Sequence, residues 1–364
     1  MRRVMHVTTA HPVSDNRILR KECTALAQAG FDVILVAVHD RDEVLHGIPV
    51  LGLPRHRGRL SRMVLGPVAA WRRLSARRPD VVHGHDPELI PLLLLYRLVH
   101  PGCRVIYDAH EDLPQQVAGK PYLPRLVRPV VARAARALEG LADRGLDAVV
   151  VATPHIGRRH ELARTVLVQN YPWLSDFPEP EPYPTDASPV VCYAGGISAG
   201  RGYEAMCALP RLVTRPLEVV LAGPCAEEVA GRPLPEGVTH LGTLAPDEVP
   251  PLLARSAAGL AVLLPLPNYL ESQPTKVYEY LAAGRPFVAS DFPYWVETFG
   301  PHRCGLFVDA TDPRAVARAV ELLLSDPEEA AAMGARGRQA VVEHFSFENE
   351  AARLCALVTD LVGR

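Results

Sequence analysis

The stretch VVCYAGGISAGRGYEAM at residues 190–206 joins a short β-branched run, a glycine-rich turn and the start of an amphipathic segment. We predict a strand over Val190–Ala194, a turn over Gly195–Gly202 and a helix directly after it. A strand that leads through a tight turn into a helix is the repeating unit of parallel sheets covered by helices on both faces. The stretch therefore predicts an α/β fold.

The same alternation recurs throughout the chain. An amphipathic pattern over Asp15–Ala29, closed by Gly30 as a C-terminal glycine cap, predicts a helix after the first strand. The remaining predicted strands are Arg3–Thr9, Asp32–Val38, Ile48–Leu53, Val81–His85, Arg104–Ala109, Ala148–Ala152, Val166–Gln169, Leu217–Ala222, Ala258–Leu264, Pro286–Ser290 and Gly305–Val308.

Length, proline content and charge divide the chain into two domains. At about 150 residues per domain, 364 residues favour two. Residues 172–189 contain six prolines and predict a stiff linker. Residues 1–170 carry 25 basic and 16 acidic side chains, a net +9, whereas the remainder carries 14 and 25, a net −11. We predict domains over 1–171 and 190–344, with the linker 172–189 between them and a closing helical segment over 345–364.

Composition excludes several protein classes. The hydrophobic content of 48% is typical of a folded globular chain. The apolar run Leu89–Val99 is shorter than the roughly 20 residues that span a bilayer, and the N-terminus lacks the apolar core of a secretory signal. Seven scattered cysteines without a C-x-x-C pair favour reduced thiols. We therefore expect a cytoplasmic protein.

Polar clusters follow several predicted strands, at the strand ends where open parallel sheets bind ligands. Among them, GGISAGRG at 195–202 matches neither the dinucleotide fingerprint nor the P-loop. Its glycines nevertheless let a phosphate approach the backbone at a helix N-terminus, and Arg201 can bind phosphate oxygens. The other clusters are His11–Arg17, His83–Glu88, Asp108–Asp112 and Gly223–Pro224.

Residues 268–286, NYLESQPTKVYEYLAAGRP, form the richest polar stretch. Pro274 fits the first position of a helix that ends before Gly284, so Lys276 lies in the first turn, where its charge opposes the helix dipole unless an anion is bound. Glu279 shares a helix face with Lys276, and Glu271 precedes the helix. The spacing of the two acids is weak evidence alone, because it recurs at Glu228/Glu236 and Glu321/Glu329.

Other kinds of site are less well supported. His83 and His85 suggest a metal, but no second ligand group has a suitable spacing, so we expect none. No local signature of a serine or cysteine nucleophile is present.

Residues 55–78 interleave eight arginines with apolar side chains, which fits an anionic membrane surface or an anionic acceptor. We expect Pro67 to interrupt any helix there, which favours the soluble acceptor. Nucleic acid is disfavoured by the low aromatic content and the acidic second half.

Taken in order, these motifs resemble the retaining glycosyltransferases of family 4, which have the GT-B fold. The segments that carry the resemblance cover nearly the whole chain: HPVSDNRILRKE at 11–22, HGHDPELIPLL at 83–93, YDAHED at 107–112, YAGGISAGRGYEAM at 193–206, ESQPTKVYEYLAAGRPFVAS at 271–290, CGLFVDATDPRAVARAV at 304–320 and HFSFENEA at 344–351. The resemblance implies two Rossmann-like domains that face a central cleft. It also implies a final helix that returns to the N-terminal domain.

The resemblance also implies residue roles. Arg201 and Lys276 would neutralise the leaving diphosphate, Glu271 would contact the donor sugar, Glu279 the ribose, and His110 the transferred sugar. These imply catalytic roles for His110, Arg201, Lys276 and Glu271. The implied donor-binding set is Gly195, Gly196, Arg201, Glu271, Ser272, Gln273, Thr275, Lys276 and Glu279. The implied acceptor-binding set is His11, Asp15, Arg17, His85 and Glu111.

Two departures from the family pattern matter. Pro274 offers no N–H where the family often has a backbone contact to the sugar, and Gly196 replaces a common basic residue.

The implied activity is metal-independent, cofactor-free and retaining. It moves a sugar from a nucleotide-diphosphate sugar, a UDP-sugar ahead of a GDP-sugar, to a hydroxyl or thiol of a small molecule, a glycan or a lipid-linked acceptor. The alternatives are a GT-B epimerase or phosphorylase and a non-catalytic nucleotide-sugar-binding protein at the inner membrane face. A dehydrogenase is disfavoured by the missing glycine fingerprint.

Overall fold

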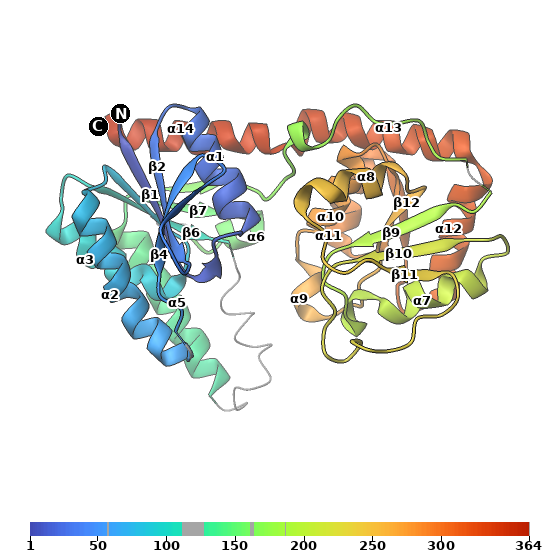
Figure 1. Cartoon of the computed structure of the whole chain (residues 1–364), viewed down its shortest axis with the longest axis horizontal. Helices are drawn as coiled ribbons and strands as arrows, with labels where there is room; N and C mark the ends of the chain where they lie inside the picture. Colours follow the sequence, from blue (N-terminus) through green and yellow to red (C-terminus); the bar gives the residue numbers. More distant parts are fainter. Residues whose placement is uncertain (57, 111–126, 161–163, 186, 364) are drawn as a thin grey trace. The chain divides into compact units, whose positions relative to one another are not determined.

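The computed structural model describes residues 1–56, 58–110, 127–160, 164–185 and 187–363. These form two compact units, and each has its own parallel sheet (Figure 1). The first unit comprises Met1–Asn170 together with Phe347–Arg364, and the second comprises Tyr171–Ser346. The second unit thus begins one residue before the proline-rich segment. The closing helix α14 (Phe347–Gly363) groups with the first unit, although its sequence follows the second.

The first unit contains an eight-stranded sheet in the order β3-β4-β2-β1-β5-β6-β7-β8. All neighbouring pairs are parallel except β3–β4, a short hairpin that the sequence patterns did not predict. The strands are β1 (Arg3–Pro12), β2 (Asp32–Val38), β3 (Glu43–Leu45), β4 (Ile48–Leu53), β5 (Val81–Gly84), β6 (Arg104–Ala109), β7 (Ala148–Val151) and β8 (Thr165–Leu167).

Helices cover both faces of this sheet. One face packs against α2 (Arg59–Arg77), α3 (Ile90–Val99) and α5 (Arg128–Gly145), with α6 (Pro154–Gly157) after β7. The other face carries a π-helical segment η1 (Asn16–Cys23), α1 (Thr24–Gln28) and α14, as Figure 1 shows. The amphipathic pattern over Asp15–Ala29 is thus helical as predicted, and Gly30 follows it with φ +90°.

Strand alternation sorts apolar from polar side chains between the two faces. Met5 and Val7 of β1 join the apolar core beneath α2 and α3. His6, between them, therefore points to the opposite face, because successive side chains alternate. His83 pairs with His6 across β1 and β5, so it lies on that same face. This register gathers several polar side chains under η1.

Helix α2 corrects one expectation from the sequence. It runs without a break from Arg59 to Arg77 and includes Pro67, which we expected to interrupt it. A proline removes only one backbone donor, and here the flanking turns continue on both sides. The arginine-rich segment is therefore one helix, with exposed Met63, Val64 and Leu65 in its first half.

The second unit contains a six-stranded parallel sheet in the order β11-β10-β9-β12-β13-β14. Its strands are β9 (Val190–Ala194), β10 (Glu218–Ala222), β11 (Val238–His240), β12 (Ala258–Ala261), β13 (Phe287–Ser290) and β14 (Gly305–Val308). Of these, β11 was not predicted, because three residues give too short a pattern. The core under one face is filled by α7 (Tyr203–Leu212) and α12 (Pro313–Ser325).

The remaining helices of the second unit are α8 (Val249–Ala254), α9 (Pro267–Leu270), α10 (Thr275–Ala282), α11 (Pro293–Phe299) and α13 (Pro327–His344). Helix α10 begins one residue later than predicted, with Pro274 as its N-cap. Gly284, at φ +69°, ends it, and the Gly284 and Arg285 N–H groups donate to the carbonyls of Leu281 and Tyr280. These bonds close the C-terminus of α10.

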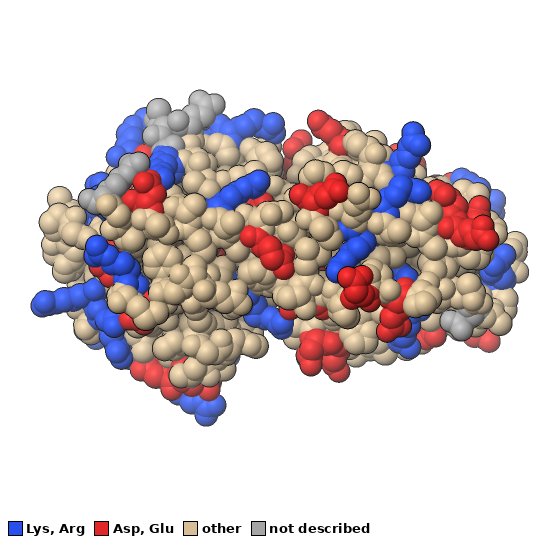
Figure 2. Space-filling model, turned by 90° about the horizontal axis from the view of Figure 1, so that it is seen from above, with Lys and Arg blue, Asp and Glu red and all other residues tan. Residues whose placement is uncertain are grey.

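The two units differ in charge, as the sequence implies. Figure 2 shows basic and acidic side chains on both units, with a larger share of basic ones on the first. Among the described helices, none combines the length and the apolar character needed to cross a bilayer.

Candidate active site

A cavity of about 550 Å³ opens in the second unit at the carboxyl ends of β9 and β10. This is the end at which parallel sheets bind ligands. Its lining residues are Ala194, Gly195, Arg201, Ala222, Gly223, Pro224, Thr243, Leu244, Val249, Leu263, Asn268, Tyr269, Ser272, Gln273, Pro274, Thr275, Lys276, Glu279 and Trp295.

Two backbone loops form a fixed rim on this cavity. The loop after β9 bonds to the loop after β10: the Gly195 N–H donates to Ala222 O and the Ile197 N–H to Pro224 O, each at 2.8 Å. Gly195 and Gly223 have φ values of +138° and +139°, which L side chains rarely adopt. A Cβ on Gly223 would lie 2.1 Å from Gly195 O, so the close approach of the two loops requires glycine at position 223.

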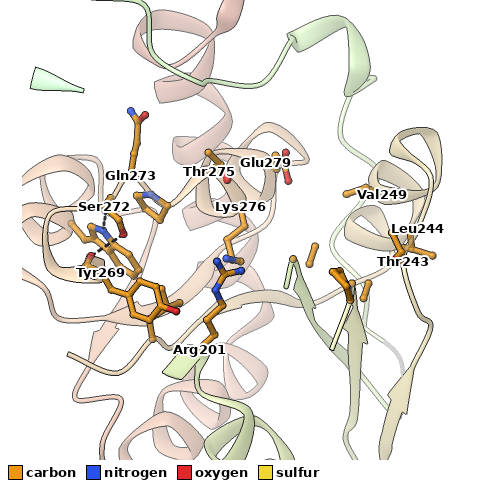
Figure 3. A pocket seen from close by; sticks show the side chains of 18 of the residues that line it. Arg201, Thr243, Leu244, Val249, Tyr269, Ser272, Gln273, Thr275, Lys276 and Glu279 are labelled. Carbon is orange, nitrogen blue, oxygen red and sulfur yellow. Dashed lines mark hydrogen bonds between the residues drawn. The ribbon is translucent and has the colours of Figure 1, made fainter. Parts of the chain in front are cut away.

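Two cations converge at the centre of the cavity. Lys276 lies in the first turn of α10, with Nζ 4.8 Å from the Tyr193 ring centroid. Its side chain runs along Gly195, where an added Cβ would come within 3.5 Å of Nζ. Arg201, from the short 3₁₀ turn that precedes α7, donates from Nη1 to Gly196 O at 3.2 Å. Figure 3 shows the two cationic groups pointing toward one another.

The surroundings of Lys276 favour a bound anion. Burial, and then the nearby charge of Arg201, lower the pKa of Lys276 to about 8. The helix dipole at the start of α10 also opposes a positive charge there. All three effects are relieved by an anion between the two side chains, so this centre is suited to a diphosphate.

The cavity has chemically different ends on either side of these cations. In Figure 3, Glu279 and the side chains of Thr243, Leu244 and Val249 lie to one side. Tyr269, Ser272 and Gln273 lie to the other. Ser272 is anchored there, because its hydroxyl donates to Tyr269 O at 2.8 Å and its carbonyl accepts from Trp295 Nε1 at 2.7 Å.

The structure brings most of the predicted donor residues into the lining. Gly195, Arg201, Ser272, Gln273, Thr275, Lys276 and Glu279 all line the cavity. Gly196 lies behind it, where its carbonyl accepts hydrogen bonds from Arg201 and from the Tyr193 hydroxyl. Glu271 lies outside the described lining and is exposed at the end of α9. Its predicted contact with the donor sugar therefore stays a prediction.

The other acid pairs with the same spacing have different surroundings. Glu321 accepts from the Thr214 N–H, and Glu329 forms an ion pair with Arg336, both at the protein surface. Neither they nor Glu228 and Glu236 are among the lining residues described. Glu279 differs from them because α10 begins at the cavity.

Sequence reasoning missed several lining residues. Thr243, Leu244 and Val249 follow β11, whose three residues gave no strand signal. Tyr269 precedes the acid pair and places its ring 5.9 Å from the Arg201 guanidinium. The available signal was the polar and aromatic sequence NYLESQ ahead of a helix start.

A second polar centre lies in the first unit around Asp108, which belongs to β6, the strand that His110 directly follows. Arg17 donates to both Asp108 oxygens, at 3.0 and 2.9 Å, and His85 Nδ1 lies 3.0 Å from Oδ2. Burial alone would raise the pKa of Asp108, but Arg17 and the histidines hold it well below its ordinary value. Asp108 is therefore a buried anion that fixes its neighbours.

Two of the predicted acceptor residues, Arg17 and His85, are buried. Arg17 and His85 are only 6% and 1% exposed, and both are bonded to Asp108. They hold the loop that carries His110 and have little surface to offer a substrate. Their acceptor roles stay predictions, and a loop position in sequence does not reveal such burial.

The other predicted acceptor residues lie nearer the surface. His11 Nε2 lies 3.0 Å from His110 Nε2, and His11 Nδ1 lies 3.4 Å from Asp15. Asp15 also caps η1 by accepting from the Ile18 N–H. Glu111, the remaining predicted acceptor residue, falls outside the described residues.

The structure also supplies neighbours for His83 that the sequence spacing did not reveal. His6 from β1 and Glu22 from η1 lie beside His83 and His85, and all four side chains are buried. Burial, followed by repulsion between the rings, lowers the pKa of both His6 and His83.

Comparison with known proteins identifies the two halves. Residues 185–340 match the model for glycosyl transferases group 1, and residues 16–164 match the model for Glycosyltransferase Family 4. Together the two matches cover most of the chain. The chain belongs to the family 4 glycosyltransferases. It is therefore a transferase, and the predicted family and enzyme class are confirmed.

Among curated relatives, an 81-residue segment is 38% identical to a GDP-mannose-dependent alpha-(1-6)-phosphatidylinositol monomannoside mannosyltransferase from Mycolicibacterium smegmatis. That match spans 22% of this chain and 21% of the relative.

Solved structures confirm the GT-B fold of this glycosyltransferase. Sucrose-phosphate synthase from Thermosynechococcus elongatus superposes with a TM-score of 0.78 at 18% identity, over 100% of both chains. HepE from Anabaena, solved in complex with UDP, gives 0.72 at 14% identity, over 99% of this chain and 100% of its own.

Proposed function

We propose that the chain is a retaining glycosyltransferase that takes its sugar from a nucleotide-diphosphate sugar bound in the cavity of the second unit. The observation that carries the proposal is the pair Arg201 and Lys276. Each lies at the start of a helix, and their side chains meet beside the glycine rim, the loops after β9 and β10 that contain Gly195 and Gly223. The diphosphate lies between them, the nucleoside on the Glu279 side and the sugar on the Tyr269 side. Glu279 binds the ribose hydroxyls, as the family resemblance implies.

The two cations take the part that a divalent ion plays in other transferases. As the bond to the sugar breaks, negative charge grows on the leaving diphosphate, and preorganised positive groups stabilise that charge most. Lys276 and Arg201 are already held against Gly195 and Gly196, so little reorganisation is needed. Transfer therefore proceeds without a metal at the diphosphate.

A UDP-sugar is the favoured donor. HepE, of similar fold, is solved in complex with UDP and glucose, and its UDP complex superposes over nearly the whole chain. The curated relative is named as GDP-mannose-dependent, so a GDP-sugar is the second candidate. The base would lie near Thr243, Leu244 and Val249, the part of the lining that can distinguish uracil from guanine.

The acid content of the cavity bears on the route by which configuration would be retained, which the family resemblance implies. Among the residues described as lining it, Glu279 is the single carboxylate, and it lies on the nucleoside side. A two-step route through a glycosyl-enzyme needs a carboxylate beside the sugar. We therefore favour attack by the acceptor on the face that the diphosphate leaves.

The acceptor carries an anionic group. A second cavity of about 240 Å³ opens in the first unit, lined by Thr9, Ala10, Pro12, Val38, Arg55, His56 and Arg62. Its basic side chains and the net +9 of residues 1–170 favour a phosphate-bearing molecule. Arg62 is half-buried and pairs with Glu88 at 2.9 Å, which fixes its position at the cavity wall.

A membrane surface is the second candidate for the anionic partner. The continuous helix α2 exposes Met63, Val64, Leu65 and Val68 by 45–64% of their surfaces, and basic Arg72, Arg77 and Arg78 follow. An amphipathic basic helix of this kind binds anionic bilayers. The acceptor would then be lipid-linked.

A transfer assay tests the proposal directly. The protein is incubated with UDP-glucose, UDP-N-acetylglucosamine or GDP-mannose and a panel of phosphorylated and neutral acceptors, and nucleotide release is measured. We expect acceptor-dependent release that continues in EDTA and is not raised by added Mg²⁺ or Mn²⁺. Proton NMR of the product should show the anomeric configuration of the donor.

The rival activities give different results in the same assay. A non-catalytic binding protein would bind nucleotide without releasing any from a sugar donor. An epimerase would release nucleotide or change the sugar without an acceptor. An inverted product would overturn the retaining assignment, and restoration by Mg²⁺ after EDTA would overturn metal independence.

A further inference from the structure

Four metal-binding side chains meet in the interior of the first unit. His6 comes from β1, His83 and His85 come from β5 and its end, and Glu22 comes from η1. One ligand atom from each lies within 4.8 Å of the others, and each side chain is at most 1% exposed. The sheet register places the three rings on one face, and η1 brings the carboxylate over them.

Several polar atoms of this cluster lack hydrogen bonds. Among the described residues, neither ring nitrogen of His83 has a hydrogen-bond partner and Glu22 Oε2 has none, whereas Glu22 Oε1 forms an ion pair with Arg17 at 3.0 Å. Buried polar groups in folded proteins are almost always paired, and each unpaired one costs about 1–3 kcal/mol. An ion bound among these side chains would explain why their polar atoms lack hydrogen-bond partners.

The distances from Glu22 to two of the histidine rings are too long for hydrogen bonds but close to those between two ligands of one ion. Glu22 Oε2 lies 3.6 Å from His83 Nδ1 and 3.9 Å from His6 Nδ1, both too long for a hydrogen bond. Two ligands of one tetrahedral ion, at bond lengths of about 2.1 Å, lie about 3.4 Å apart. No two of these ligand atoms lie more than 4.8 Å apart, so each would move by at most about 0.7 Å to reach that spacing.

The neighbours of the cluster supply the second layer that metal sites need. His85 Nδ1 donates to Asp108, so its Nε2 accepts a hydrogen bond from His6 Nδ1 at 2.9 Å, and a bound ion would replace that hydrogen bond. A carboxylate behind a histidine in this way fixes the tautomer and orients the metal-binding nitrogen. Arg17 lies 3.0 Å from Glu22 Oε1 and also binds Asp108, so Oε2 is the oxygen left for an ion.

Charge distinguishes the candidate occupants. Arg17 is shared between Asp108 and Glu22, so a charged Glu22 in this dry cluster has no cation of its own. A bound cation would supply that charge and would also engage His83, whose ring nitrogens lack hydrogen-bond partners, whereas a water molecule supplies no charge. We propose that His6, Glu22, His83 and His85 bind a structural zinc ion that ties β1, β5 and η1 together.

Zinc suits this ligand set, because it prefers four ligands of imidazole nitrogen and carboxylate oxygen. All four positions are filled by protein, so the ion has no open position for substrate. The ligands all belong to the first unit, whereas the donor cavity consists of second-unit residues. A closed, buried site keeps its ion during a brief exposure to chelator, so the EDTA assay of transfer does not address it.

Metal analysis of untagged full-length protein tests the inference. After gel filtration in metal-free buffer, wild type should contain about one zinc per chain. Glu22→Gln and His83→Gln should each reduce this to below a tenth. His160→Gln is the matched control, because His160 is a buried histidine of the same unit, paired with Asp143 at 2.6 Å, and it should leave the zinc content unchanged.

A second measurement uses wild type alone and therefore tests the inference even if the variants fail to fold. Wild type is stripped of metal in mild denaturant with chelator, returned to buffer and titrated with Co²⁺. We expect one equivalent to bind with the visible absorption of a four-coordinate nitrogen and oxygen site, and the thermal midpoint to rise. Purified protein without zinc, together with a stripped protein that takes up no Co²⁺, would overturn the inference. UDP binding by the same samples reports separately on the donor cavity.

Discussion

At the scale of single residues, the account depends on the charge of Lys276. Its pKa of about 8 in the empty cavity means that the positive charge is present below pH 8 and is lost as pH rises above it. A bound diphosphate raises that pKa, so binding near pH 8–9 takes up a proton. We expect the dissociation constant of UDP to increase from pH 7 to pH 9.

Calorimetry in two buffers of different ionisation enthalpy measures this proton uptake. Lys276→Met should bind weakly at both pH values and show no uptake, whereas Lys276→Arg keeps its charge and should remove the pH dependence. Unchanged UDP affinity of wild type between pH 7 and pH 9 would show that Lys276 is not the diphosphate ligand.

Glu279 of α10 and Glu271, which precedes that helix, should affect the kinetics differently when each is replaced by alanine. Glu279 lines the nucleoside side of the cavity, where contacts are equal in ground and transition states, so Glu279→Ala should mainly raise the donor KM. Glu271→Ala should mainly lower kcat if Glu271 contacts the sugar, whose charge and shape change during reaction. Steady-state kinetics separates the two, and the exposed Glu228→Ala serves as a control. An exchanged pattern would mean that the donor lies in the opposite direction.

At the scale of elements, the glycine rim is the most vulnerable part of the donor site. Gly223→Ala combines a positive φ with a Cβ 2.1 Å from Gly195 O, so the loops after β9 and β10 must separate. We expect UDP affinity to fall at least tenfold and stability to fall by about 1–3 kcal/mol. Gly231→Ala is the control, because it has φ +74° but nothing within 4 Å. Similar losses in both variants would mean that strain alone, and not the contact between loops, is responsible.

Elements were predictable from sequence where their patterns were long. The strand runs at Asp32–Val38 and Val190–Ala194 agree with β2 and β9 to the residue, because buried parallel strands are continuous apolar runs. β3 and β11 have three residues each, too few to show a period. α2 continued through Pro67, because packing of the flanking turns outweighed one lost hydrogen bond.

Residues of the site were likewise predictable only where their signal was local in the sequence. Lys276 and Arg201 were predictable because each is local to a strand–turn–helix signature. Thr243 and Val249 were not, since they reach the cavity through a loop that only the fold places there. Likewise, the contacts of His83 with Glu22 join residues 61 positions apart, which no local spacing can show.

At the scale of the whole molecule, the basic first unit should govern the choice of partner. The continuous α2 favours a membrane-surface acceptor more strongly than an interrupted segment would. If the membrane is the anionic partner, the protein should sediment with anionic but not neutral vesicles, and it should be released as the Debye length falls from about 10 Å at 0.1 M salt to about 3 Å at 1 M.

Replacement of Arg72, Arg73, Arg77 and Arg78 by serine should abolish the sedimentation without changing UDP affinity. Arg73 also pairs with Asp42, so folding of this variant is checked by circular dichroism. If wild type does not sediment with anionic vesicles, the acceptor is a soluble phosphate-bearing molecule and α2 is not a membrane contact.

The central claim is that Arg201 and Lys276 hold a nucleotide diphosphate, and calorimetric titration of UDP in EDTA tests it most directly. Wild type and the exposed control Arg211→Ala should bind UDP. Arg201→Ala and Lys276→Ala should each lose about 1.5–3 kcal/mol, roughly 10- to 150-fold in affinity, since each removes a charged contact. Equal binding of UDP by wild type and both variants, or no binding of UDP and GDP by wild type, would contradict the account.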